Sequence, residues 1–167
     1  MSRKIVFYKK KIFNKAFEIF LEEGMDKVTA RNIAKIVNCS TTPIYSYYQS
    51  MEELKKELIN HLLEVIKKYT DYSYTENEYI NQSIGFCRFA KERKKIFLSI
   101  HRDKEFLENI ILNFSKKDEN YNLENWWIFV YGYSVLIGNS YISPDLDEIK
   151  NTLITNQNII LKKNEIN

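Results

Sequence analysis

The segment STTPIYSYYQSMEEL, residues 40–54, contains two helix-start signals in close succession. Ser40 is a favourable N-cap, and Pro43 falls in the first turn, where its missing backbone N–H costs nothing. Ser50 starts a second helix, because Ser50-x-x-Glu53 has the spacing of a capping box ahead of a long apolar repeat. The segment therefore predicts a helix of about seven residues placed directly before a long one.

Two more helices are predicted ahead of this segment. Apolar residues at helical spacing predict a first helix over roughly residues 4–23, ended by Gly24. Thr29 opens a second helix of about eight residues, which ends near Asn38, a residue that tolerates the left-handed conformation. Two short helices joined by such a turn form a helix-turn-helix, whose second helix suits the major groove of DNA. Because many helical bundles contain a similar corner, the spacing alone leaves DNA binding open.

The charge distribution favours the same end of the chain. Residues 1–50 carry 9 Lys/Arg against 4 Asp/Glu, whereas residues 51–167 carry 16 against 18. A basic head on a neutral body is typical of a protein that binds a polyanion.

A family resemblance supports this interpretation. Residues 28–54, VTARNIAKIVNCSTTPIYSYYQSMEEL, resemble the DNA-binding head of the tetracycline-repressor-like (TetR) family of bacterial regulators. The matching features are Thr29, Ser40, Ile44-Tyr45, Tyr47-Tyr48, Ser50 with Glu52 or Glu53, and Leu54. The resemblance covers about residues 5–60. It implies an all-α protein with a three-helix head, joined by a long fourth helix to a helical ligand-binding and dimerisation domain.

The expected DNA-binding residues lie on the second and third helices. Thr41, Thr42 and Tyr45 form the outward face of the third helix and are expected to reach base edges, with Pro43 and Ser46 beside them. Thr29, Arg31 and Tyr47 are expected to contact phosphates. Three positions depart from the family pattern: Asn38 replaces a glycine, Cys39 stands where valine is common, and Met51 replaces a lysine that contacts phosphate in the family.

The domain boundary is expected near residue 50, with residues 1–50 as the DNA-binding domain and 51–167 as the body; the head includes the fourth helix to about residue 60. Apolar spacing in the body predicts further helices at 76–93, 95–101, 104–118, 122–142 and 145–162. The stretch 125–144 is uncharged and approaches the length of a membrane span, but polar residues interrupt it. A helix covered on two sides is the better interpretation.

Two kinds of site are expected in the body. An apolar face of the last two helices is expected to pair with a second copy, through Ile128, Val135, Gly138, Ile142, Ile149, Leu153 and Ile160. The family resemblance implies a cavity for a small hydrophobic effector, with Phe86, Phe89, Phe97, Trp126, Trp127 and Tyr131 as candidates. Each of these aromatic residues also fits an ordinary core.

Other functional classes have little support in the sequence. Cys39 and Cys87 match no zinc or redox spacing, which indicates reduced thiols in a cytoplasmic protein. His61 and His101 have no partner at ligand or catalytic spacing, and no phosphate loop or nucleophile elbow appears. The sequence therefore predicts neither an enzyme nor a cofactor or metal site. The N-terminus lacks the apolar region of a signal peptide.

Three hypotheses follow. The leading one is a homodimeric repressor that a hydrophobic effector releases from a palindromic operator. The second is a DNA-binding protein with no small-molecule switch, such as a nucleoid-associated or partner-regulated factor. The third is a small-molecule-binding protein or enzyme whose head is vestigial.

Overall fold

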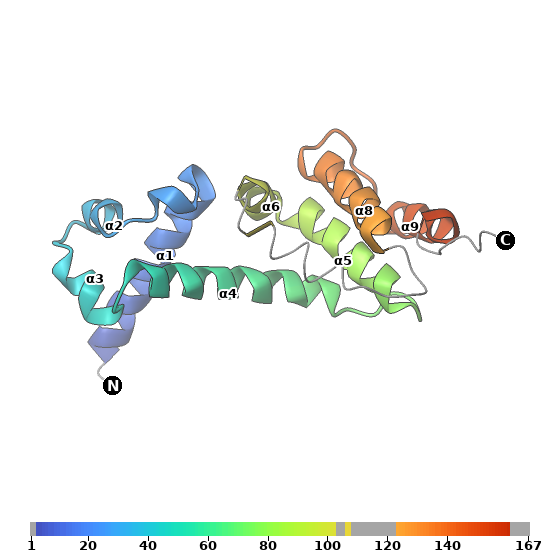
Figure 1. Ribbon diagram of the computed structural model, residues 1–167. Helices are drawn as coiled ribbons and strands as arrows, with labels where there is room; N and C mark the ends of the chain where they lie inside the picture. Colours follow the sequence, from blue (N-terminus) through green and yellow to red (C-terminus); the bar gives the residue numbers. More distant parts are fainter. Residues whose placement is uncertain (1–2, 103–105, 108–122, 161–167) are drawn as a thin grey trace. The chain divides into compact units, whose positions relative to one another are not determined.

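The computed structural model confirms an all-α architecture. It describes residues 3–102, 106–107 and 123–160, with side chains from Tyr8 onward, and this part of the chain contains helices and no strand. Two compact units divide the chain, Met1–Glu64 and Val65–Asn167, and helix α4 contributes residues to both (Figure 1).

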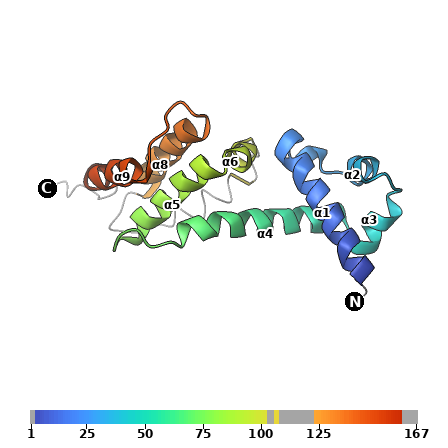
Figure 2. The same cartoon turned by 180° about the vertical axis from the view of Figure 1, so that it is seen from behind.

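The first unit consists of three helices and the first part of a fourth. They are α1 (Arg3–Glu23), α2 (Ala30–Val37), α3 (Thr42–Tyr47) and α4 (Met51–Thr70), with a short 3-10 turn at Met25–Lys27. Helix α1 crosses the first half of α4 in both views (Figures 1 and 2). The core of this unit is apolar and fully buried, and it includes Ile12, Ala16, Phe20, Ile33, Ile44, Leu54 and Leu58.

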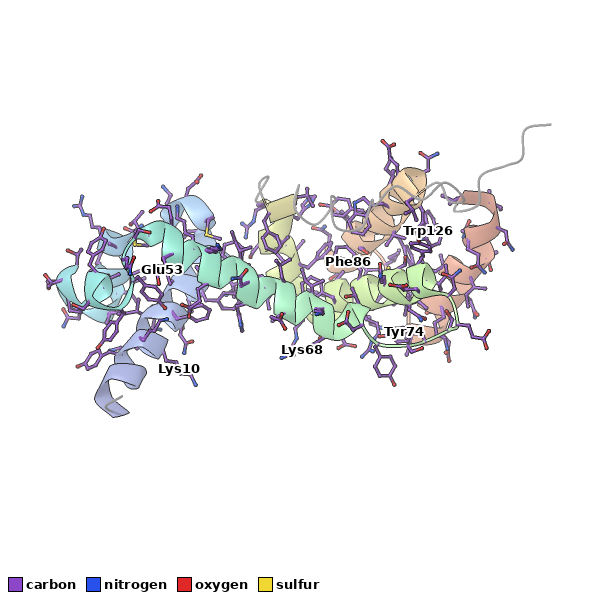
Figure 3. The ribbon with its side chains drawn as sticks, turned by 60° about the horizontal axis from the view of Figure 1, so that its bottom comes forward. Lys10, Glu53, Lys68, Tyr74, Phe86 and Trp126 are labelled. Carbon is purple, nitrogen blue, oxygen red and sulfur yellow. The ribbon has the colours of Figure 1, made fainter. Side chains whose placement is uncertain are left out.

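Helix α5 (Glu78–Glu92) is the centre of the second unit. It packs against α6 (Lys94–His101), α8 (Leu123–Gly138) and α9 (Leu146–Ile160). Phe86 and Trp126 lie where α5 and α8 meet (Figure 3), and both are buried. Gly85 lies directly against the backbone of Tyr69, so the absence of a side chain lets α5 contact the end of α4.

Two helix ends differ from the sequence prediction. Helix α8 ends at Gly138 instead of continuing to residue 142, because Ser140 adopts a left-handed conformation with φ 63°. The Nζ of Lys94 donates to Ser140 Oγ at 2.7 Å, and this bond holds the turn in place. Asp145, expected as the first residue of the last helix, instead caps α9: its Oδ1 accepts the Glu148 N–H at 2.9 Å, and Glu148 Oε2 accepts the Asp145 N–H at 2.8 Å. The helix expected at 104–118 lies largely outside the described residues.

No helix in the described part of the chain combines the length and apolarity needed to cross a bilayer.

Candidate nucleic-acid interface

Local structure fixes both ends of α2. Thr29 Oγ1 caps α2 by accepting the Asn32 N–H at 3.2 Å. Asn38 ends α2 in the left-handed conformation, with φ 59° and ψ 54°. The asparagine thus provides the backbone shape for which the family uses glycine, so this departure leaves the turn intact.

Helix α3 presents one polar face to solvent. Ile44 and Tyr48 are buried on its inner side, as predicted, whereas Thr41, Thr42, Tyr45 and Ser46 are exposed. The N-cap of α3 is Thr41 rather than the expected Ser40, and its side chain makes no capping hydrogen bond. Hydroxyl groups and an aromatic ring therefore stand on a surface that is open to a partner.

The buried side of α3 is anchored by a polar cluster. The Nζ of Lys9 lies 4.8 Å from the centre of the Tyr48 ring and 3.0 Å from Glu57 Oε2. Burial, together with the negative charges of Glu57 and Glu53, raises the pKa of Tyr48, so its hydroxyl stays protonated. Lys9 thus ties α1 to the residues that fix the end of α3 and the start of α4.

The capping box predicted at the start of α4 is present. The Glu53 N–H donates to Ser50 Oγ at 3.1 Å, and Glu53 Oε2 accepts the Gln49 N–H at 2.6 Å. The short link between α3 and α4 is therefore held by its own side chains.

The candidate phosphate contacts stand at helix ends beside this face. Thr29 and Arg31 are exposed at the start of α2, while Tyr47 is half-buried at the end of α3. Met51 is half-buried at the first position of α4. Gln49, which the sequence analysis did not select, is exposed in the link between α3 and α4, and its place between the two predicted helices was the signal that could have pointed to it.

Comparison with known proteins identifies this arrangement. Residues 12–58 match the family model of bacterial regulatory proteins of the tetR family. Residues 12–58 therefore resemble the DNA-binding head of this family. The matched model describes bacterial regulatory proteins, and the match covers part of α1, all of α2 and α3, and the start of α4.

Solved structures share the TetR fold over most of the chain. One is a TetR-family transcriptional regulator from Haemophilus influenzae RD, with 15% identity and a TM-score of 0.59, covering 97% of this chain and 100% of its own. Another is a TetR-like transcriptional regulator from Rhodococcus sp. RHA1, with 17% identity and a TM-score of 0.56, covering 87% of this chain and 90% of its own. No curated protein sequence matches the chain.

The second unit contains an aromatic cluster, formed by five of the six predicted ligand-binding residues: Phe86, Phe89, Phe97, Trp127 and Tyr131. Phe86 is central, with ring centroids 5.8 Å from Phe97 and 5.0 Å from Trp127. The sixth residue, Trp126, instead donates its indole N–H to Ser83 Oγ at 2.9 Å. Among the described residues, the space enclosed beside Phe86, Phe89 and Phe97 is too small for a water molecule.

A polar pair that the sequence analysis missed borders this cluster. His101 Nδ1 and the Tyr131 hydroxyl share a hydrogen bond, and both residues line the same enclosed space. Burial raises the pKa of Tyr131 to about 12. The two residues are 30 positions apart, and nothing in their spacing signals the contact. His61 packs edge-on against Phe13 and Phe17 in the first unit, which is a structural role.

The structure corrects part of the predicted dimer interface. Gly138, Ile149 and Leu153 are buried in the core of their own unit, so they are not available to a second copy. Each of these residues packs inward, because α8 contacts α5 and α6, and α9 contacts α5, within the same unit. Ile128 is exposed, while Val135, Ile142 and Ile160 are partly exposed.

One surface groove involves none of the predicted ligand residues. It has a volume of about 610 Å³ and is lined by Tyr133, Ile142, Ser143, Pro144, Glu148, Asn151 and Thr152. Its lining is mostly polar, and no apolar pattern in the sequence pointed to it.

Proposed function

We propose that this protein is a TetR-family regulator, a homodimeric repressor that binds a palindromic operator and is released by a small hydrophobic effector. The observation that carries the proposal is the exposed face of α3, where Thr41, Thr42 and Tyr45 stand clear of the core that buries Ile44. In a symmetric dimer two such helices would enter successive major grooves, with centres roughly 34–36 Å apart.

Exposed apolar side chains support the homodimer. Ile128 and Leu136 on α8 are 63% and 43% exposed, and Ile159 on α9 is 72% exposed. Several large apolar groups exposed on two neighbouring helices are typical of an interaction surface. A second copy of the chain is the simplest partner, because isologous dimers dominate among oligomers.

The aromatic cluster is the proposed effector site. An apolar ligand that opens the cluster would need to displace packed rings, with His101 and Tyr131 as its polar contacts. Release from DNA then follows if the effector binds better to a dimer whose heads are spaced wrongly for the operator.

The described part of the cluster leaves no room for a ligand, which favours a second candidate, a dimeric DNA-binding regulator with no small-molecule switch. Footprinting of the purified protein on DNA upstream of its own gene distinguishes the two. Protection that is lost on adding members of a panel of hydrophobic compounds supports the switch. Protection that persists with every compound supports the second candidate, and no protected site would contradict both.

A further inference from the structure

The chain around α3 is free of charge. Residues 38–50 contain no Lys, Arg, Asp or Glu, and this range spans the turn before α3, the helix itself and the link to α4. In the major groove, guanine is read mainly by Arg or Lys and cytosine by Asp or Glu. The helix that faces the bases therefore lacks the side chains that select G·C pairs.

Besides its hydroxyl groups, the exposed face of α3 carries apolar groups. Thr41 and Thr42 each carry a γ-methyl group, and Tyr45 carries a ring that is 52% exposed. Such groups make contact with the C5-methyl of thymine, which projects into the major groove. This contact distinguishes thymine from every other base.

The hydroxyl groups of this face select bases poorly. Ser46 Oγ donates its proton to the Thr42 carbonyl at 3.0 Å, so this hydroxyl can only accept from a base. A threonine hydroxyl both donates and accepts, and can therefore pair with more than one base edge. Gln49 is exposed in the link that follows the helix, and a carboxamide pairs with adenine.

The nearby cations lie on other helices. Arg31 and Lys35 are exposed on α2, which in a helix-turn-helix crosses the DNA backbone. Lys10 extends from α1 (Figure 3). These side chains suit phosphates, which supply affinity but carry no sequence information.

We propose that α3 selects its operator through thymine methyl groups, so that the base pairs it contacts are A·T pairs. Specificity comes from contacts of Thr42, its neighbour Thr41 and Tyr45 with these methyl groups, and not from a charged bidentate contact with guanine. The inference rests on the proposed DNA-reading role of α3 and adds the base composition of the site.

The first test selects binding sites from random duplex DNA with the full-length protein. The expected consensus has A·T pairs at the positions protected by α3. Deoxyuridine then replaces each thymine in turn, which removes only the C5-methyl group. Affinity should fall about fourfold for each contacted thymine, the factor that corresponds to one buried methyl group. Deoxyuridine outside the half-sites should have no effect.

A second test asks whether the γ-methyl group of Thr42 contacts the C5-methyl group of a thymine. Thr42→Ser removes the γ-methyl and keeps the hydroxyl. It should weaken binding to the thymine site severalfold, yet cause little further loss on the uracil site. Thr155→Ser, an exposed position on α9, is the matched control and should bind both sites like the unaltered protein. Equal melting temperatures of the two variants would exclude a folding defect.

The outcomes separate this inference from the proposed function. A specific site with G·C pairs under α3, or one insensitive to uracil, overturns the inference and leaves the regulator intact. If 7-deazaguanine weakens binding of the unaltered protein but not of Arg31→Ala, then Arg31 recognises guanine in the operator. This result also overturns the inference. Failure to select any specific site overturns both.

Discussion

Gly138 lies directly against the ring of Phe97. A Cβ atom added at Gly138 would stand 2.5 Å from Phe97 Cδ1 and 2.7 Å from Cε1. The ring cannot move aside easily, because it is 2% exposed and packs against Phe86 and Phe89. The last turn of α8 therefore approaches α6 only because residue 138 has no side chain.

Gly138→Ala is expected to destabilise the protein by about 1–3 kcal/mol, the usual cost of overpacking a core. Gly132→Ala is the matched control on the same helix, since nothing lies within 4 Å of a Cβ at that position. This control should raise stability by about 0.5–1 kcal/mol through helix propensity. Denaturant unfolding of both variants measures the difference, and equal effects would contradict the packing at Gly138.

The proposed dimer is tested at exposed positions, where a substitution does not disturb the core of the subunit. Ile128→Glu combined with Ile159→Glu should shift sedimentation from dimer to monomer, since both side chains would carry charge into the proposed interface. Tyr72→Glu adds the same charge at a residue that is 60% exposed before α5, and should leave the mass unchanged. A dimer that survives the double change would place the interface elsewhere.

The left-handed residue in the turn before α3 gives a prediction about the head. Asn38→Val should cost about 1–2 kcal/mol, because a β-branched side chain clashes in the left-handed conformation that this position adopts. Asn38→Gly should be tolerated, since glycine has no such penalty. Thermal unfolding monitored by circular dichroism compares the two, and a fully stable Asn38→Val would show that the turn relaxes at no cost.

The two cysteines should differ sharply in reactivity. Cys39 is exposed, whereas Cys87 is fully buried with its Sγ 3.4 Å from Ser134 Oγ. A thiol reagent at pH 8 should label one site quickly, and Cys39→Ser should remove that fast phase. Labelling of Cys87 is expected only on unfolding; two fast phases would contradict its burial.

Burial raises the pKa of Cys87 to about 12 from an ordinary value near 9.0. Folding therefore favours the protonated thiol, and this contribution to stability is complete below pH 9. It is lost as the pH rises toward 12, because only the unfolded chain ionises freely there. Cys87→Ala should flatten this alkaline decline in unfolding experiments, and an unchanged slope would refute the assignment.

The head could be predicted in detail because its signals are local. Three features each involve residues within a few positions of one another: the helix cap at Thr29, the left-handed Asn38 and the capping box of Ser50 and Glu53. The structure contains all three. The family resemblance fixed the order of the helices around them.

The body was less predictable because its decisive contacts are distant in sequence. Lys94 holds the turn at Ser140 from 46 positions away, and this contact helps to end α8 earlier than the apolar pattern indicated. Nor does an apolar stripe reveal which of two faces meets the core. Ile149 and Leu153 repeat at helical spacing as an interface would, yet α5 covers this face of α9 within the same unit.

Met51 provides a test of how the head docks on DNA. It occupies the first position of α4, where the TetR resemblance places a phosphate-contacting lysine, and a methionine cannot make that contact. Met51→Lys should therefore add one phosphate contact per subunit. Each contact releases about 0.9 counterion, so the log–log salt slope of a dimer should steepen by roughly 1.8.

The gain should be about equal on operator and random DNA, because phosphates carry no sequence information. Glu78→Lys, an exposed position at the start of α5, changes charge in the same direction and is the control for a general effect of net charge. Filter binding between low and moderate salt measures both slopes. If Met51→Lys leaves the slope unchanged, or matches the control, then the start of α4 does not face the DNA backbone. The proposed docking of α3 in the major groove would then require a different orientation of the head.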